Sequence, residues 1–180
     1  MKIITGKYKN LRIETINKTS TRPMMSRVKE SLFSSISGHL IDKKVLDLFA
    51  GSGSLGIESL SRGASSCLFI ELSKDSINKL IKNLDITEDD VKVLNDDVYR
   101  WVEKNNESFD IVFVDPPFEH KENMVTELIT KLIKNLNDEG LIILHRDSSS
   151  NIINIQDKLE LVKKRKFGQS ILHIYKKEKK

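Results

Sequence analysis

The chain has 180 residues, which is enough for one α/β domain with a complete core and a small appendage. Charged residues make up 31% and hydrophobic residues 38%, the balance of an ordinary globular protein, and a solvated surface explains the net charge of +4. The single Cys67 excludes an internal disulfide, and the sequence shows neither a membrane-length apolar run nor a signal-peptide core after Met1, so we expect a cytoplasmic protein without membrane contact.

The first 41 residues are expected to form a small unit of their own, a hairpin followed by a helix. From Ser26 to Ile36, apolar residues recur at helical spacing, and Lys29 and Glu30 are expected to face solvent. The two strands of the hairpin are predicted at Lys2–Thr5 and Leu11–Thr15.

From residue 42 onward, apolar runs alternate with helical patterns, which predicts a second domain at residues 42–180. Near-continuous Val, Ile and Leu strands separated by helices imply a parallel sheet that is covered on both faces. We expect an α/β fold with a seven-stranded, mostly parallel sheet and a C-terminal antiparallel strand pair around Gly168-Gln169. The expected strands are Val45–Phe49, Ser66–Glu71, Val91–Leu94, Phe109–Val114, Leu141–Leu144, Leu159–Phe167 and Ser170–Lys176, and the expected helices are Ser54–Arg62, Ser73–Leu84, Val98–Lys104 and Glu122–Asn135.

The first of these strands feeds directly into a glycine-rich turn, the segment Asp47-Leu48-Phe49-Ala50-Gly51-Ser52-Gly53-Ser54-Leu55-Gly56. Gly51 and Gly53 let the backbone approach a ligand and adopt dihedral angles that other residues avoid. Glu71 closes the next strand, where an acid can accept hydrogen bonds from ribose hydroxyls. The glycine spacing alone also matches the fingerprint of dinucleotide-binding proteins.

Asp47 separates these two interpretations, because an acid this close to the first glycine would repel a pyrophosphate. It suits a ligand that carries an ammonium and a sulfonium, as S-adenosylmethionine does. Asp97 follows the third expected strand, and its carboxylate can accept from an adenine amino group, with Asp96 as the neighbouring alternative. These acids favour S-adenosylmethionine over a dinucleotide.

The segment Asp115-Pro116-Pro117-Phe118 follows the strand expected at Phe109–Val114. Two consecutive prolines exclude helix and hold the backbone extended, so the carbonyls of Asp115 and Pro116 can point into a cleft. An acceptor-only carboxylate, a rigid carbonyl and an aromatic face form a receptor for a planar ring that bears an NH2 group. The combination predicts methylation of the exocyclic amine of a nucleobase, and the alternative is a proline-rich turn without function.

Basic residues gather toward both ends of the chain, which favours a polyanionic partner. Lys163-Lys164-Arg165-Lys166 forms one basic run, whereas the last five residues are better explained as a solvated tail. The remaining candidates are expected to have no chemical role. The histidines lack ligand spacing with acids or cysteine, so no metal site is predicted, and Cys67 and Trp101 are expected in the core.

The acids and glycines from Asp47 to Gly56, Glu71, Asp97 and the Asp115–Phe118 segment resemble class I S-adenosylmethionine-dependent methyltransferases that act on exocyclic amines. Arg22-Pro23-Met24-Met25-Ser26-Arg27-Val28-Lys29-Glu30-Ser31-Leu32-Phe33 is similar to a segment of the bacterial 16S ribosomal RNA guanine-N2 methyltransferase family, and the resemblance covers nearly the whole chain. It implies a Rossmann-like class I fold, S-adenosylmethionine as cofactor, and the N2 amine of a guanine in 16S ribosomal RNA as the methyl acceptor.

The resemblance also implies partners and residue roles. The partner would be 16S ribosomal RNA within the 30S subunit or an assembly intermediate, bound by a monomer that needs no metal. Residues 1–41 would be an RNA-binding extension, with Arg12, Arg22 and Arg27 as contacts. The expected catalytic residues are Asp115, Pro116, Pro117 and Phe118, and the expected cofactor contacts are Asp47, Gly51, Gly53, Leu55, Glu71, Asp97 and Val98.

The chain departs from the family pattern in its N-terminal hairpin, at Met24, where the family has threonine, and at His145-Arg146, where it often has glutamate. These departures concern RNA docking more than the chemistry. Two rival functions remain. An N6-adenine methyltransferase acting on DNA or another RNA would usually carry tyrosine after the two prolines and a target-recognition insertion. An RNA-binding module that has lost catalysis conflicts with the intact acids and glycines.

Overall fold

The structure is a computed structural model that describes residues 1–15, 26–151, 153 and 158–179. Its strands are β1 (Lys44–Leu48), β2 (Ser66–Glu71), β3 (Asp90–Asn95), β4 (Phe109–Val114), β5 (Leu136–Asp147), β6 (Leu159–Phe167) and β7 (Ser170–Lys177). Its helices are α1 (Ser26–Ser35), α2 (Ser54–Ser61), α3 (Lys74–Leu84), α4 (Val98–Lys104) and α5 (Glu122–Leu132), with short 3-10 helices η1 (Ser37–His39) and η2 (Ile133–Asn135).

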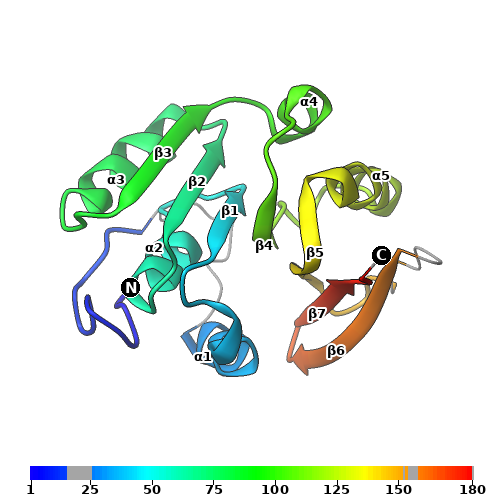
Figure 1. Ribbon diagram of the computed structural model, residues 1–180, viewed down its shortest axis with the longest axis horizontal. Coiled ribbons are helices and arrows are strands. Elements are labelled where there is room, and N and C mark those ends of the chain that lie inside the picture. The colour runs from blue at the N-terminus through cyan, green and yellow to red at the C-terminus, as the bar shows by residue number, and fades with distance from the viewer. Residues whose placement is uncertain (16–25, 152, 154–157, 180) are drawn as a thin grey trace.

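The seven strands form one sheet in the order β3-β2-β1-β4-β5-β7-β6 (Figure 1). The first five strands of this order pair in parallel, and β7 runs antiparallel to both β5 and β6. The predicted mostly parallel sheet with a C-terminal antiparallel pair is therefore confirmed. β5 begins earlier than expected, because Leu136 already pairs with Phe109. An irregularity separates this pair from the continuous register, which starts where Ile111 pairs with Leu141.

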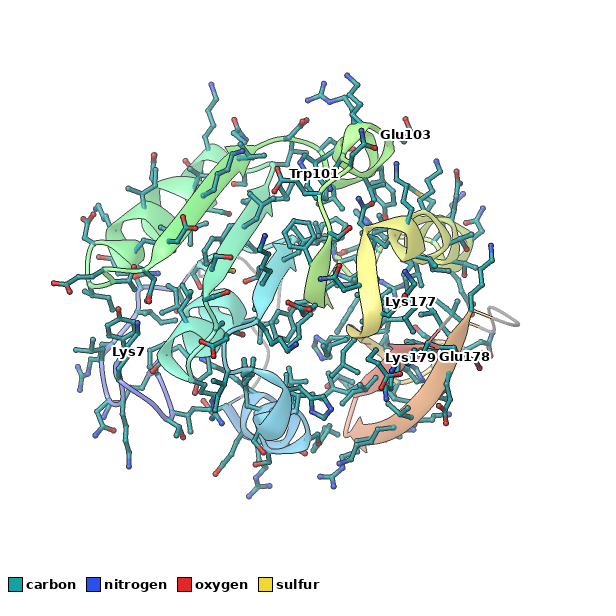
Figure 2. The ribbon with its side chains drawn as sticks, viewed as in Figure 1. Lys7, Trp101, Glu103, Lys177, Glu178 and Lys179 are labelled. Carbon is teal, nitrogen blue, oxygen red and sulfur yellow. The ribbon has the colours of Figure 1, made fainter. Side chains whose placement is uncertain are left out.

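Two hydrophobic cores lie on the two faces of the sheet. Helices α1, α2 and α3 pack on one face, where the rings of Phe33 and Phe113 are 5.9 Å apart, and α4 and α5 pack on the other. Trp101, a residue of α4, lies in the second core, as predicted, and is 7% exposed (Figure 2). Cys67 is a buried free cysteine in the first core, also as predicted.

The N-terminal segment folds back on itself as expected, but the two predicted strands are reduced to an isolated bridge. Lys2 and Arg12 form an antiparallel bridge, and the N–H of Ile3 donates to the carbonyl of Leu11 at 3.0 Å. Ile3 and Ile13 are buried in the same core as α1 and α2, so the segment is continuous with the sheet in its packing. A division of the chain after residue 41 remains a prediction. The two parts share a hydrophobic core, so the division would be one of function, with RNA binding assigned to the first part.

Lys29 is not on the solvent face of α1, and this expectation was wrong. Its side chain has no exposed surface, and its Nζ lies 3.0 Å from Oε2 of Glu58 on α2. Because α2 covers this side of α1, the buried face of α1 is wider than its apolar stripe. Glu30 is exposed, as expected.

Candidate active site

The carboxyl ends of β2, β1, β4 and β5 meet at one edge of the sheet, because these neighbouring strands are parallel. Leu48 of β1 pairs with Ile70 and Val114 on its two sides, and Val114 pairs with Leu144. The next position on each strand path therefore falls in one row along this edge: Glu71, Phe49, Asp115 and His145. Open parallel sheets bind their ligands outside this edge.

Asp47 is the most strongly perturbed acid of this edge. It is 1% exposed, and its Oδ2 accepts a hydrogen bond from the N–H of Gly56 at 2.9 Å. Burial, together with the negative charges of Asp115 and Glu71, raises the pKa of Asp47 to about 8, although the Gly56 bond and Lys29 oppose the shift. A cation bound beside Asp47 would favour its ionised form, so the site is suited to a positively charged ligand.

Two glycines of the turn, Gly51 and Gly53, differ in what surrounds the position of the missing side chain. Gly53 has a φ of 78°, and a Cβ there would lie 2.3 Å from Leu80 Cδ1, so its absent side chain makes room for the core. Gly51 has a φ of 57°, and the nearest atom to a Cβ would be the Phe49 carbonyl oxygen at 4.0 Å. Open space for a ligand therefore lies at Gly51.

Glu71 connects the end of β2 to the glycine-rich turn. Its Oε2 accepts from the N–H of Gly51 at 2.8 Å, and its Oε1 accepts from the N–H of Ser73 at 2.8 Å. Leu72, directly after it, is a large apolar residue with 61% of its surface exposed. The carboxylate is thus held at the sheet edge by two backbone donors, next to an apolar surface that a flat ring could cover.

Asp97 and Asp96, the two acids after β3, have different surroundings. Asp97 is the N-cap of α4 and accepts from the N–H of Arg100 at 3.0 Å. Asp96 pairs with the guanidinium of the same arginine, which lowers the pKa of Asp96. The side chains of Leu55 and Val98 are buried in the two cores, so any ligand contact from these two positions would come mainly from their backbone.

Asp115 directly follows β4 and carries a half-buried carboxylate. Its Oδ1 lies 2.8 Å from Nδ1 of His145, whose side chain is 4% exposed, whereas that of Asp115 is 29% exposed. The ring of Phe118 meets the His145 ring edge-on, with centroids 5.6 Å apart. The sequence reasoning assigned no role to His145, and only the register of β4 with β5 brings it beside Asp115.

Arg146 holds the loop that continues from the two prolines. Its two terminal guanidinium nitrogens donate to the carbonyls of Pro117 at 3.1 Å and His120 at 2.7 Å. Pro116 is buried, whereas Pro117 and Phe118 are partly exposed. The rigidity that the prolines predicted is therefore reinforced from β5, and the Pro117 carbonyl is already occupied by Arg146.

Three aromatic rings form a cluster around Phe49 at this edge. The Tyr99 hydroxyl and the His120 Nδ1 are 2.9 Å apart, and Phe49 meets both rings edge-on. Phe49 has a φ of 58°, a rare conformation for a residue with a side chain, which directs the chain from β1 into the turn. The sequence reasoning assigned no role to Tyr99 or His120.

The expected RNA contacts are placed in part. Arg12 and Arg27 are exposed, and Arg22 lies outside the described residues. The Arg165 guanidinium on β6 donates to the Ser31 hydroxyl on α1 at 2.8 Å, so the basic run of β6 adjoins α1. Lys7 lies toward one end of the molecule, whereas Lys177 and Lys179 lie in the opposite half, so these three lysines do not share one surface (Figure 2).

Other kinds of site find no support in the described part of the chain. No three His, Cys, Asp or Glu side chains gather there in a way that could hold a metal ion. None of its helices is both long and apolar enough to cross a membrane. A shallow depression lies on the exposed face of α5, and it is lined by one helix alone: Glu122, Asn123, Thr126, Glu127 and Thr130.

Comparisons with known proteins agree over nearly the entire sequence. The family model described as Conserved hypothetical protein 95 matches residues 1–176. Ribosomal RNA small subunit methyltransferase D from Buchnera aphidicola subsp. Baizongia pistaciae is 40% identical over 177 residues, 95% of this chain and 88% of that protein. The protein of the same name from Escherichia coli K12 is 31% identical and covers 99% of this chain and 90% of its own. A solved structure of a candidate methyltransferase from Escherichia coli has a TM-score of 0.90 at 31% identity, covering 100% of this chain and 99% of the other.

Proposed function

This chain belongs to the Conserved hypothetical protein 95 family, and we propose that it transfers a methyl group from S-adenosylmethionine to the exocyclic N2 amine of a guanine in 16S ribosomal RNA. Two relatives that match almost the full chain are named ribosomal RNA small subunit methyltransferase D. The observation that carries the proposal is the juxtaposition of two acids. A buried Asp47, suited to a cation, lies on β1 two residues before the sheet edge, close enough to Asp115 of the Asp-Pro-Pro-Phe segment for the charge of Asp115 to raise its pKa.

The residues at the edge fit S-adenosylmethionine. Its sulfonium and ammonium charges match Asp47, and the open space at Gly51 lets the ligand approach the turn, where Gly53 shapes the backbone. Glu71 would accept from the ribose hydroxyls, with Leu72 against the adenine, and Asp97 would accept from the adenine amino group. Leu55 and Val98 would contribute backbone contacts. When bound, the cofactor supplies a methyl group on a cationic sulfur.

The Asp115–Phe118 segment would orient the guanine. The Asp115 carboxylate and the Pro116 carbonyl accept the two N–H groups of the amine, which localises the nitrogen lone pair and aims it at the methyl carbon. Pro117 keeps the backbone extended, and Phe118 stacks on the base. Such orientation can contribute about 7–11 kcal/mol in favourable cases. The guanine must leave its stack to reach the segment, as in other base-modifying enzymes.

Residues 1–41 and the basic run of β6 would hold the RNA. Arg12 and Arg27 are exposed, Arg22 belongs to the same stretch of sequence, and α1 adjoins Arg165. Because RNA phosphates attract lysine and arginine, binding would weaken as salt rises. We propose that the enzyme acts as a monomer in the cytoplasm, on the 30S subunit or an assembly intermediate.

The decisive experiment is transfer of a labelled methyl group to undermethylated 30S subunits, followed by mapping of the modified base. We expect label on the N2 amine of a single guanine in 16S ribosomal RNA, and no label with Asp115→Ala. Label on adenine N6 would favour the rival enzyme. A wild-type protein that binds RNA but transfers no methyl group to 30S subunits, to deproteinised 16S RNA or to DNA would overturn methyltransferase activity altogether.

A further inference from the structure

Asp115 and His145 are neighbours across two parallel strands. Val114 and Leu144 are paired in the register of β4 with β5, so the next residues on the two strands stand side by side. Their closest atoms, Asp115 Oδ1 and His145 Nδ1, are 2.8 Å apart. His145 is buried, with 4% of its side chain exposed, and Phe118 packs edge-on against its ring. Both rings of this group therefore have few alternative positions.

The direction of the hydrogen bond follows from the groups that form it. An ionised carboxylate only accepts hydrogen bonds, so the hydrogen lies on Nδ1 whether the imidazole is neutral or protonated. Nε2 is buried and has no hydrogen-bond partner among the described residues. Within the described residues, the imidazole of His145 therefore has one hydrogen-bond partner, Asp115. Because the ring is buried, its orientation toward Asp115 is fixed.

This contact divides the Asp115 carboxylate into two oxygens with different surroundings. Oδ1 is occupied by His145, and no hydrogen bond from a described residue reaches Oδ2. The terminal torsion of an aspartate is soft, so without a partner the carboxylate would sample a broad range of orientations. With Oδ1 fixed by His145, Oδ2 keeps one direction, and the 29% exposure of the side chain leaves room for a ligand to reach the carboxylate.

We infer that His145 is a positioning residue for methyl transfer: its Nδ1–H holds Asp115 so that Oδ2 accepts from the substrate amine, and its ring edge supports Phe118. The inference rests on the proposed function. His145 touches neither substrate nor cofactor in this role. A loss of alignment of the order of 1 Å can cost a reaction about 100-fold, so removal of the hydrogen bond is expected to slow transfer without weakening cofactor binding.

Two substitutions distinguish positioning from packing. His145→Asn keeps an N–H donor two bonds from Cβ, where Nδ1 stands, whereas His145→Leu keeps apolar volume and removes the donor. In single-turnover assays with saturating RNA, we expect about a 10–100-fold slower rate for His145→Leu and a rate within a few-fold of wild type for His145→Asn. Calorimetry should give the same cofactor dissociation constant for all three proteins, and urea unfolding should show that both variants fold.

A wild-type rate in a folded His145→Leu variant would overturn the inference. So would a His145→Asn variant that folds and yet is as slow as His145→Leu, because packing of the imidazole would then explain the loss. The KM for RNA is a further readout. It should change little, since the substitution acts on the turnover of bound substrate.

Nitrogen-15 NMR of the His145 ring tests the contact without any substrate. We expect a hydrogen on Nδ1 in the wild type and loss of that preference in Asp115→Ala. If the wild type transferred no methyl group to RNA, the proposed function would fail, and this spectrum alone would show whether His145 holds Asp115. A ring with its hydrogen on Nε2 only would disprove the contact, whatever the activity.

Discussion

Lys29 and Glu58 form an ion pair with 3.0 Å between Nζ and Oε2, and neither side chain has any exposed surface. Glu58 also accepts from the backbone N–H groups of Ile4 at 2.8 Å and Thr5 at 3.1 Å, and from Arg62 Nε at 2.8 Å. Desolvation would raise the pKa of Glu58, but these donors and Lys29 outweigh it and keep the pKa low. One carboxylate thus joins α1 and the N-terminal hairpin to α2, the helix that begins at the glycine-rich turn.

We predict that the two partners contribute unequally to stability. Glu58→Gln leaves the Lys29 ammonium buried without its counter-charge, and this should lower the free energy of unfolding by about 3–5 kcal/mol. Lys29→Met should cost less, because Glu58 keeps Arg62 and two backbone donors. Urea unfolding followed by circular dichroism measures both. As a control, Lys131→Met removes two surface ion pairs, to Glu103 and Glu127, and each should contribute at most about 1 kcal/mol. A Lys29→Met cost above that of Glu58→Gln would contradict the account.

Asp47 should make cofactor affinity depend on pH. With a pKa of about 8, Asp47 is mostly protonated at neutral pH, and a bound cation requires it to release that proton. Affinity for S-adenosylmethionine should therefore rise about tenfold per pH unit up to about pH 8 and then level off. Calorimetry in buffers of different ionisation enthalpy should detect proton release, and Asp47→Asn should abolish it. An affinity independent of pH from 6 to 8 would argue against an Asp47–cation contact.

The same group should affect stability in the opposite direction. The folded-state pKa of Asp47, about 8, is above the ordinary value of 3.8, so the folded chain holds a proton that the unfolded chain releases. Its contribution to stability is therefore complete below the ordinary pKa and is lost as pH rises toward 8. Asp47→Asn still accepts from Gly56 and avoids this loss. The variant should unfold at higher urea than wild type at pH 8, and the difference should shrink toward pH 5.

Glu71 should contribute to cofactor binding more than Asp96, a partly exposed acid at the end of the adjacent strand β3. Glu71→Ala removes a carboxylate placed for the ribose and also frees the N–H of Gly51, so affinity should fall by about 1–3 kcal/mol. Asp96→Ala, an acid paired with Arg100, serves as the control and should leave affinity within a factor of two or so. Calorimetry with S-adenosylmethionine ranks the variants. The reverse ranking would mean that the ligand lies along β3 instead.

Asp115→Asn should be almost as damaging as Asp115→Ala. His145 would bond to the amide oxygen of the asparagine, which leaves its NH2 group facing the NH2 group of the substrate. Two donors that face each other cannot align the amine, so the single-turnover rate should fall at least about 100-fold with little change in unfolding free energy. A wild-type rate in either variant would mean that the Asp-Pro-Pro-Phe segment is a turn without a catalytic role.

Arg27 should contribute to RNA affinity and to its salt dependence. It lies one helical turn from Ser31, which bonds to Arg165, so α1 and β6 present their charges side by side. Arg27→Glu should weaken RNA binding, and the slope of log affinity against log salt should fall by about 0.7–0.9 for each lost phosphate contact. Lys104→Glu makes the same charge change on α4, across the sheet, and should change neither quantity if the contact surface lies on the α1 side. Equal effects of both substitutions would indicate attraction by net charge alone.

The fold was predictable where local patterns decide it. Val, Ile and Leu runs predicted β2 and β4 with their observed bounds, and the break at Gly168-Gln169 predicted the final strand pair. Lys29 was misplaced because its burial depends on Glu58, a residue distant in sequence whose side chain compensates the charge. The spacing of apolar residues along one helix does not predict whether a second helix covers its polar side.

The site residues could be predicted where they stand in short contiguous motifs. Asp47 and Asp115 each stand in a segment with prolines or glycines that narrow the interpretation. His145 stands in an ordinary apolar strand, and its contact with Asp115 arises from the register of β4 and β5, which no short-range signal encodes. Arg146 is similar, since its two carbonyl partners lie in a loop that the sequence described only as rigid.

β6 is one of the two outer strands of the sheet, and its outer side presents backbone groups that another sheet could join (Figure 1). Val162 on this strand is 44% exposed, and this apolar surface would favour such self-association. The four basic residues that follow it act as gatekeepers, because two copies of the strand would bring like charges together. Replacement of these residues by apolar ones would thus affect colloidal behaviour as well as RNA affinity, whereas glutamate in their place would keep the edge charged.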